Sequence, residues 1–115
     1  MKTILIASGL LAMATSAIAQ EKPVLTVFTY DSFNTEWGPG PQIEEAFEAT
    51  CECDLQFVGA GDGAALLARI RLEGARTDAD VVLGLDTNLT AAAADTGIFG
   101  LHDMDLSNLD LPVDW

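Results

Sequence analysis

The sequence predicts an α/β fold with a parallel sheet at its core, and three observations support this. Apolar, β-prone runs occur three times, at residues 24–30, 54–58 and 79–85. The first and third runs show little polar alternation, which is typical of strands buried on both faces. A segment with helical spacing of apolar residues follows each run, so the order is βαβαβα. This order implies parallel strands joined by right-handed crossovers.

The first helix is expected at residues 41–50, between the first two strands. Pro41 suits the first turn of a helix, and a Gly-Pro-Gly loop precedes it. Apolar side chains recur at helical spacing on one side of this segment, and glutamates occupy the other side. The apolar set is Ile43, Ala46 and Phe47, and the acidic set is Glu44, Glu45 and Glu48.

The second helix is expected at residues 63–73, with Asp62 as its N-cap and Gly74 as its C-terminal stop. The third is expected at residues 88–96, through a run of alanines, and Gly97 ends it. The tail beyond Phe99 shows no clear element. The apolar face of the second helix comprises Leu66, Leu67 and Ile70, and Arg69 and Arg71 are expected to face solvent.

The charge of the chain excludes several functions. The 115 residues include 18 acidic and 5 basic side chains, for a formal charge of −13. An acidic surface repels phosphate, which argues against a nucleic-acid partner and against docking on anionic lipid. Cationic or neutral ligands are favoured instead. Half of the residues are hydrophobic, which argues against disorder.

The first nineteen residues have the pattern of a secretory signal peptide. Lys2 is followed by an apolar run at residues 4–13, and Ala17-Ile18-Ala19 is a small-x-small cleavage site. The apolar run is shorter than the roughly 20 residues that a membrane span needs, although an uncleaved anchor is the alternative. We therefore expect residues 1–19 to direct export and residues 20–115 to form the exported domain.

Cys51 and Cys53 are the only cysteines, and export to an oxidising compartment permits a disulfide between them. The spacing is awkward, because residues two apart in an extended strand have Cα atoms roughly 7 Å apart, at the limit for bridging. A bridge requires a local kink, so a disulfide and a reduced pair both remain open. Two cysteines and the single histidine, His102, make a poor zinc site, since structural zinc takes four ligands.

Ligands of open parallel sheets bind at the carboxyl ends of the strands, which directs attention to three loops. Aromatic and acidic side chains follow the predicted strands, and both attract an organic cation. Structural alternatives exist: Tyr30 packs against the core, Trp37 is a loop residue, and Asp62 and Asp86 cap helices. No nucleophile elbow or histidine-based metal motif is present, so binding is favoured over catalysis. The candidate ligand-binding residues are Tyr30, Trp37, Asp62, Gly63 and Asp86.

Three stretches closely resemble the periplasmic thiamine-binding proteins, the substrate-binding components of bacterial thiamine ABC importers. They are Lys22–Phe33, Trp37–Pro41 and Ala79–Leu89, and the likeness covers about residues 22–99. The resemblance implies one lobe of a type II periplasmic binding protein, which clamps thiamine, thiamine phosphate or thiamine diphosphate between two lobes. It also implies a periplasmic location, a permease partner, no enzyme activity and no cofactor. The second lobe is expected to be absent from residues 20–115, which would then be the N-terminal lobe.

The resemblance also assigns roles to individual residues. Tyr30 and Trp37 match aromatic residues that line the thiamine pocket, and Asp62-Gly63 matches a pair expected to hydrogen-bond the aminopyrimidine. Asp86 lies in a matching motif, and its contact with the ligand is a hypothesis. Three alternatives stay open. The chain binds another cation, such as a polyamine or ferric iron; it is a small secreted enzyme or redox protein; or it is a partial fragment without function.

Overall fold

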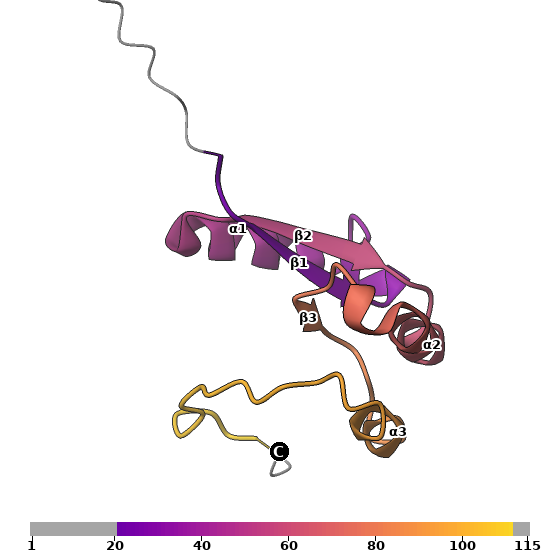
Figure 1. Cartoon of the computed structure of the whole chain (residues 1–115). Helices are drawn as coiled ribbons and strands as arrows, with labels where there is room; N and C mark the ends of the chain where they lie inside the picture. The colour runs from indigo at the N-terminus through magenta and orange to yellow at the C-terminus, as the bar shows by residue number, and fades with distance from the viewer. Residues whose placement is uncertain (1–20, 112–115) are drawn as a thin grey trace, which may run out of the picture.

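The structure, a computed structural model of the chain, describes residues 21–111 (Figure 1). The predicted signal peptide lies outside the described residues. The helices and strands alternate along the chain, with two short 3-10 helices, η1 and η2, between them. In order they are β1 Val24–Thr29, η1 Asp31–Asn34, α1 Gly40–Cys51, β2 Asp54–Gly59, α2 Gly63–Glu73, η2 Gly74–Arg76, β3 Val81–Val82 and α3 Thr90–Ala94.

The three strands form one parallel sheet in the order β2-β1-β3, which confirms the predicted α/β class. β1 pairs with β2 along its whole length, from Val24 opposite Asp54 to Thr29 opposite Gly59. β3 pairs with β1 only at Val81 and Val82. The strand that comes first in the sequence is therefore the central strand.

The strand order places α1 and α2 on opposite faces of the sheet. The first crossover moves from β1 to one neighbour, and the second returns across β1 to the other neighbour. Crossovers between parallel strands follow a right-handed rule, and two right-handed crossovers in opposite directions place their helices on different faces. On the α2 face, Phe28 packs against Leu66 and Ile70, and all three are at most 2% exposed. This cluster is the core that fixes the carboxyl ends of the strands.

α1 lies along β1 and β2 (Figure 1), but its apolar side is less buried than the sequence predicts. Ile43 and Phe47 are 43% and 42% exposed, whereas Glu48 is half-buried. A hydrogen bond that the periodicity does not reveal accounts for the position of Glu48. The backbone amide of Leu55, on the edge strand β2, donates to Oε1 of Glu48 at 2.8 Å. An edge amide needs an acceptor, so this glutamate turns toward the sheet.

A disulfide joins Cys51, the last residue of α1, to Cys53, which precedes β2. The Cα atoms are 5.1 Å apart, within bridging distance. Glu52, between them, has a left-handed backbone with φ 53° and supplies the kink that the spacing requires. The bridge therefore closes the corner between α1 and β2.

Arg69 contacts the core rather than only solvent. Its guanidinium carbon lies 4.0 Å from the centre of the Phe28 ring, and its Nε donates to Oε1 of Glu73 at 2.7 Å. The hydroxyl of Thr77 donates to the other carboxylate oxygen of Glu73 at 2.8 Å. These hydrogen bonds from Arg69 and Thr77 lower the pKa of Glu73 below its ordinary value. The network links the end of α2 to the segment that leads into β3.

β3 and α3 are both shorter than predicted. The ladder continues for one hydrogen bond beyond β3, from the amide of Leu83 to the carbonyl of Phe28 at 2.9 Å, and Gly84 then leaves it with φ 108°. α3 starts at Thr90 because a turn occupies the residues before it. Residues 97–111 contain no helix or strand. Within the described part of the chain, no helix is both long and apolar enough to cross a membrane.

Candidate ligand-binding site

The carboxyl ends of β1, β2 and β3 meet at one edge of the sheet, and four of the five candidate residues lie within four residues of these ends. Tyr30 follows β1, Asp62 and Gly63 follow β2, and Asp86 lies four residues beyond β3. This edge is where parallel sheets bind ligands. The fifth candidate, Trp37, lies in the same connection between β1 and α1 as Tyr30, but on the far side of η1.

Tyr30 lies between two of the three strand ends. On one side its ring meets Phe33 edge-on, with centroids 5.6 Å apart and an interplanar angle of 76°. Phe33 is buried and packs on Phe57, at 5.2 Å between centroids. On the other side the Tyr30 ring lies against the backbone of Gly84, where a Cβ atom would overlap Cδ1 of the ring. Tyr30 is half-buried, so it packs on the protein while part of it stays accessible.

Asp62 is the N-cap of α2, as predicted. Its Oδ1 accepts from the amide of Ala65 at 2.8 Å, and its backbone is extended, as the cap requires. Among the described residues its other carboxylate oxygen forms no hydrogen bond. Gly63 begins α2, and a Cβ there would lie 3.1 Å from the carbonyl oxygen of Gly84 and 3.2 Å from Cδ1 of Leu89. The start of α2 thus lies against the end of β3.

Asp86 forms a turn and does not cap α3, so the helix-cap interpretation is wrong. Its Oδ1 accepts from the amide of Asn88 at 2.8 Å, and its carbonyl accepts from the amide of Leu89 at 3.0 Å. The residue in the N-cap position of α3 is Leu89, which has no side-chain acceptor. An aspartate that bonds the backbone two residues on competes with helix formation, which explains the late start of α3.

Trp37 projects from the loop between η1 and α1 and is 86% exposed. The loop itself is fixed, because the amide of Gly38 donates to the carbonyl of Thr35 at 2.9 Å. Within residues 21–111 Trp37 makes no ring contact with another aromatic side chain. The structure therefore brings Tyr30, Gly63 and the segment after β3 together, and it leaves Trp37 as an exposed aromatic side chain in the connection between β1 and α1.

Two residues of this edge were not among the sequence candidates. Gly84 gives Tyr30 room to approach, and Asp31 links the loops after β1 and β2 through its carboxylate. Their signals in the sequence are weak: one is a glycine at the end of an apolar run, and the other is an aspartate just after a strand. Neither signal indicates which distant segment the residue contacts.

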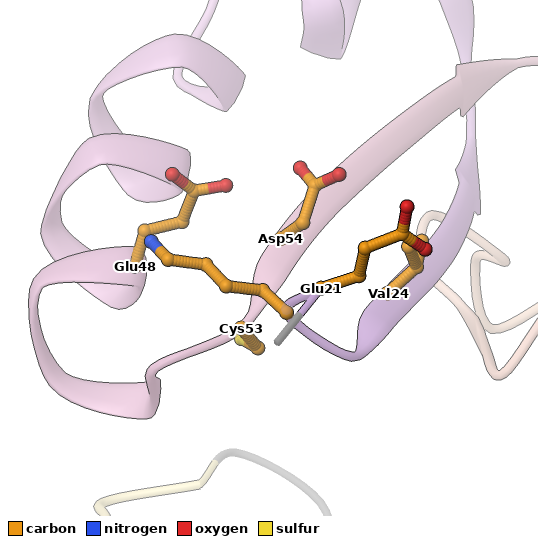
Figure 2. Close-up of a pocket in the computed structure, with 6 residues that line it drawn as sticks. Glu21, Val24, Glu48, Cys53 and Asp54 are labelled. Atoms are coloured by element: carbon orange, nitrogen blue, oxygen red, sulfur yellow. The ribbon is translucent and has the colours of Figure 1, made fainter. Parts of the chain in front are cut away.

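A surface hollow of about 380 Å³ lies at the opposite end of the sheet (Figure 2). The carboxylates of Glu21, Glu48 and Asp54 surround it, together with Lys22, Val24 and Cys53. Val24 and Asp54 begin their strands, so this is the amino edge of the sheet, and Glu48 is already bonded to the amide of Leu55. We place the candidate site at the carboxyl edge instead, because the strand ends and aromatic side chains converge there.

The metal-binding side chains are dispersed in the described residues. No group of three or more His, Cys, Asp or Glu side chains among residues 21–111 is arranged to hold a metal ion. His102, the single histidine, lies in the tail, where its Nδ1 accepts from the amide of Met104 at 3.0 Å.

Comparison with known proteins identifies close relatives. The chain is 53% identical over 94 residues to the thiamine-binding periplasmic protein of Brucella suis biovar 1 (strain 1330), and 52% identical over 94 residues to that of Escherichia coli (strain K12). These matches cover 82% of this chain, and 28% and 29% of the relatives. The protein of the same name from Haemophilus influenzae (strain ATCC 51907 / DSM 11121 / KW20 / Rd) is 43% identical over 116 residues and is covered to 34%. No family model matches the chain.

A solved structure agrees with the sequence comparison. A periplasmic thiamin binding protein superposes with a TM-score of 0.77 at 48% sequence identity, over 93% of this chain and 32% of that one. The chain thus spans about a third of the length of the relatives that it matches. The resemblance drawn from the sequence is confirmed: the chain is a homologue of the periplasmic thiamine-binding proteins over that third of their length.

Proposed function

We propose that this chain forms one side of a thiamine site in a periplasmic binding protein. Such a protein captures thiamine, thiamine phosphate or thiamine diphosphate and delivers it to the permease of an ABC importer, without chemical change. Residues 1–19 would direct export, and residues 20–115 would form one lobe. The rest of the length found in the relatives would supply the opposite side of the site. The observation that carries the proposal is the convergence of Tyr30, Asp62 and Gly63 at one sheet edge in a homologue of thiamine-binding proteins.

Each candidate residue offers an interaction that thiamine can use. The faces of Tyr30 and Trp37 attract the cationic thiazolium, for about 0.5–2 kcal/mol per contact. The oxygen of Asp62 that does not cap α2 accepts from the amino group of the pyrimidine. Gly63 lets the ligand approach the backbone closely, since it has no side chain. Asp86 adds negative charge to the edge that receives the cation.

The test is calorimetric titration of thiamine into the naturally produced protein and two variants. Trp37→Ala removes an exposed aromatic surface, and we expect about tenfold weaker binding. Asp62→Ser keeps an oxygen that caps α2 but removes the carboxylate, and we again expect at least about tenfold weaker binding. Leu101→Ala, at a side chain that is 92% exposed in the tail, is the matched control and should bind normally.

The outcomes separate the alternatives. Unchanged affinity in both site variants would remove the assignment of the site. Absence of thiamine binding by the unaltered protein would remove the proposed function itself. Competition between thiamine and spermidine, followed by thermal shift, distinguishes a thiamine protein from a polyamine protein, because the tighter ligand dominates the shift.

A further inference from the structure

We propose that Asp31 is a positioning residue for the ligand site, an inference that rests on the proposed function. Asp31 acts on the site indirectly, by holding the backbone of the loop that contains Asp62 and leads into Gly63. Asp31 follows Tyr30, while Gly61 precedes Asp62, so this one side chain lies between two candidate ligand-binding segments. The two residues are 30 apart in the sequence.

The contact between the two loops is reciprocal. The amide of Asp31 donates to the carbonyl of Gly61 at 2.8 Å, and the amide of Gly61 donates back to Oδ1 of Asp31 at 2.9 Å. One residue earlier, the amide of Ala60 donates to the carbonyl of Thr29 at 2.9 Å. The ladder between β1 and β2 therefore continues past both strands, and the Asp31 carboxylate accepts the last of its hydrogen bonds.

Two glycines make this arrangement possible. A Cβ atom on Gly59 would lie 2.6 Å from Oδ1 of Asp31, so a side chain there would displace the carboxylate. Gly61 has φ 83°, a left-handed conformation that costs glycine little. The turn at Gly61 directs the chain into Asp62, whose extended backbone caps α2. Without the carboxylate, the amide of Gly61 loses its acceptor, and the turn keeps only the two backbone hydrogen bonds that join it to the end of β1.

The chain holds a matched control for this contact. At the amino end of the sheet the amide of Asp80 donates to the carbonyl of Thr26 at 2.9 Å, and the amide of Thr26 donates to Oδ2 of Asp80 at 2.8 Å. The hydrogen-bond pattern is the same, but this pair joins β1 to the segment before β3, away from Tyr30 and Asp62. Loss of either carboxylate removes the same kind of hydrogen bond. Only Asp31 lies at the carboxyl edge of the sheet, where the candidate site is, which we call the ligand edge.

The experiment compares thiamine affinity and stability in the naturally produced protein. Asp31→Ala should weaken binding about tenfold, and Asp31→Asn should restore most of it, since the amide oxygen can still accept from Gly61. Asp80→Ala should lower stability comparably and leave the affinity unchanged. If Asp31 acts through the Asp62 loop, the double variant Asp31→Ala/Asp62→Ser should bind only slightly more weakly than Asp62→Ser alone.

Three results would overturn the proposal: unchanged affinity in Asp31→Ala, an equal loss in Asp80→Ala, or additive losses in the double variant. Amide hydrogen exchange supplies a readout independent of thiamine. The Gly61 amide should exchange faster in Asp31→Ala and not in Asp31→Asn or Asp80→Ala. If the unaltered protein binds no thiamine, the proposed function fails, whereas the exchange result still decides whether Asp31 holds the loop.

Discussion

At the scale of single residues, the carboxylates of the ligand edge share one feature. Asp31, Asp62 and Asp86 each bond a backbone amide through Oδ1, at 2.9, 2.8 and 2.8 Å. Each amide belongs to a turn or to the first turn of a helix, where no other backbone acceptor is available. The acidic side chains therefore build the loops of this edge, and the charge they bring is available to a ligand as well.

Gly84 is the residue whose replacement should disturb this edge most directly. Its φ of 108° strains any other residue, and a Cβ would overlap the ring of Tyr30. We expect Gly84→Ala to lower the free energy of unfolding by about 1–3 kcal/mol, measured by urea denaturation. Gly100→Ala is the control, because a Cβ there meets nothing within 4 Å, and it should change stability by less than about 0.5 kcal/mol. Equal stability of the two variants would contradict this account.

Glu73 should make the stability depend on pH. Hydrogen bonds from Arg69 and Thr77 lower its pKa in the folded state. The charged carboxylate is therefore stabilised more in the folded state than in the unfolded state. The stabilisation is complete above the ordinary glutamate pKa and is lost as the pH falls through the lowered, folded-state pKa. Urea unfolding between pH 7 and pH 3 should show a smaller decrease in the free energy of unfolding for Glu73→Gln than for the unaltered protein. Glu45→Gln, at an exposed position on α1, should show the same decrease as the unaltered protein.

At the scale of elements, the sequence predicts best what local signals determine. The predicted bounds of α2 match the structure at both ends, because its N-cap, its C-terminal glycine and its apolar spacing are all local signals. The position of α1 also follows from local signals, but the burial of Glu48 depends on its hydrogen bond to the amide of Leu55, a contact with another element. β3 is short because pairing with β1 and the turn at Gly84 decide its length. Periodicity contains no information on either contact.

The residues of the candidate site also fall into two groups: those that the sequence predicts and those that only the structure reveals. The rule that ligands bind at the carboxyl ends of parallel strands leads from the sequence to Tyr30, Asp62 and Asp86. The rule also covers the loop that contains Asp31, but it does not reveal the roles of Asp31 and Gly84, because each role comes from a partner in another segment of the chain. The sequence thus indicates which loops meet, and the structure is needed to show what holds them together.

The corner between α1 and β2 should depend only modestly on its disulfide. Cys51 and Cys53 are two residues apart, so the closed loop is short and the bridge removes little entropy from the unfolded chain. The loop-entropy relation gives about 1–2 kcal/mol for so small a loop. Cys51→Ser/Cys53→Ser should lower the free energy of unfolding by that amount in denaturant titrations. A reducing agent should destabilise the unaltered protein similarly and the double variant not at all, and a larger loss would assign the bridge a greater role.

At the scale of the whole molecule, charge and composition agree with the proposed ligand. The formal charge of −13 attracts a cation over several ångströms and speeds its association, an effect that salt weakens. Most of these acids lie on the exposed surface, away from the ligand edge. Long-range attraction and local recognition are thus separate contributions: the first would come from the overall charge, and the second from the proposed contacts with Tyr30, Trp37 and Asp62.

The central position of β1 has a consequence for how the protein folds. β1 is made first, but its partners arrive later: Asp31 meets Gly61 across 30 residues, and Thr26 meets Asp80 across 54. Distant segments lose loop-closure entropy before their stabilising contacts form, and this slows folding. During synthesis, β1 stays without its second neighbour until β3 has emerged. The carboxyl edge of the sheet is assembled from the ends of all three strands, so it is complete only once β3 has paired with β1.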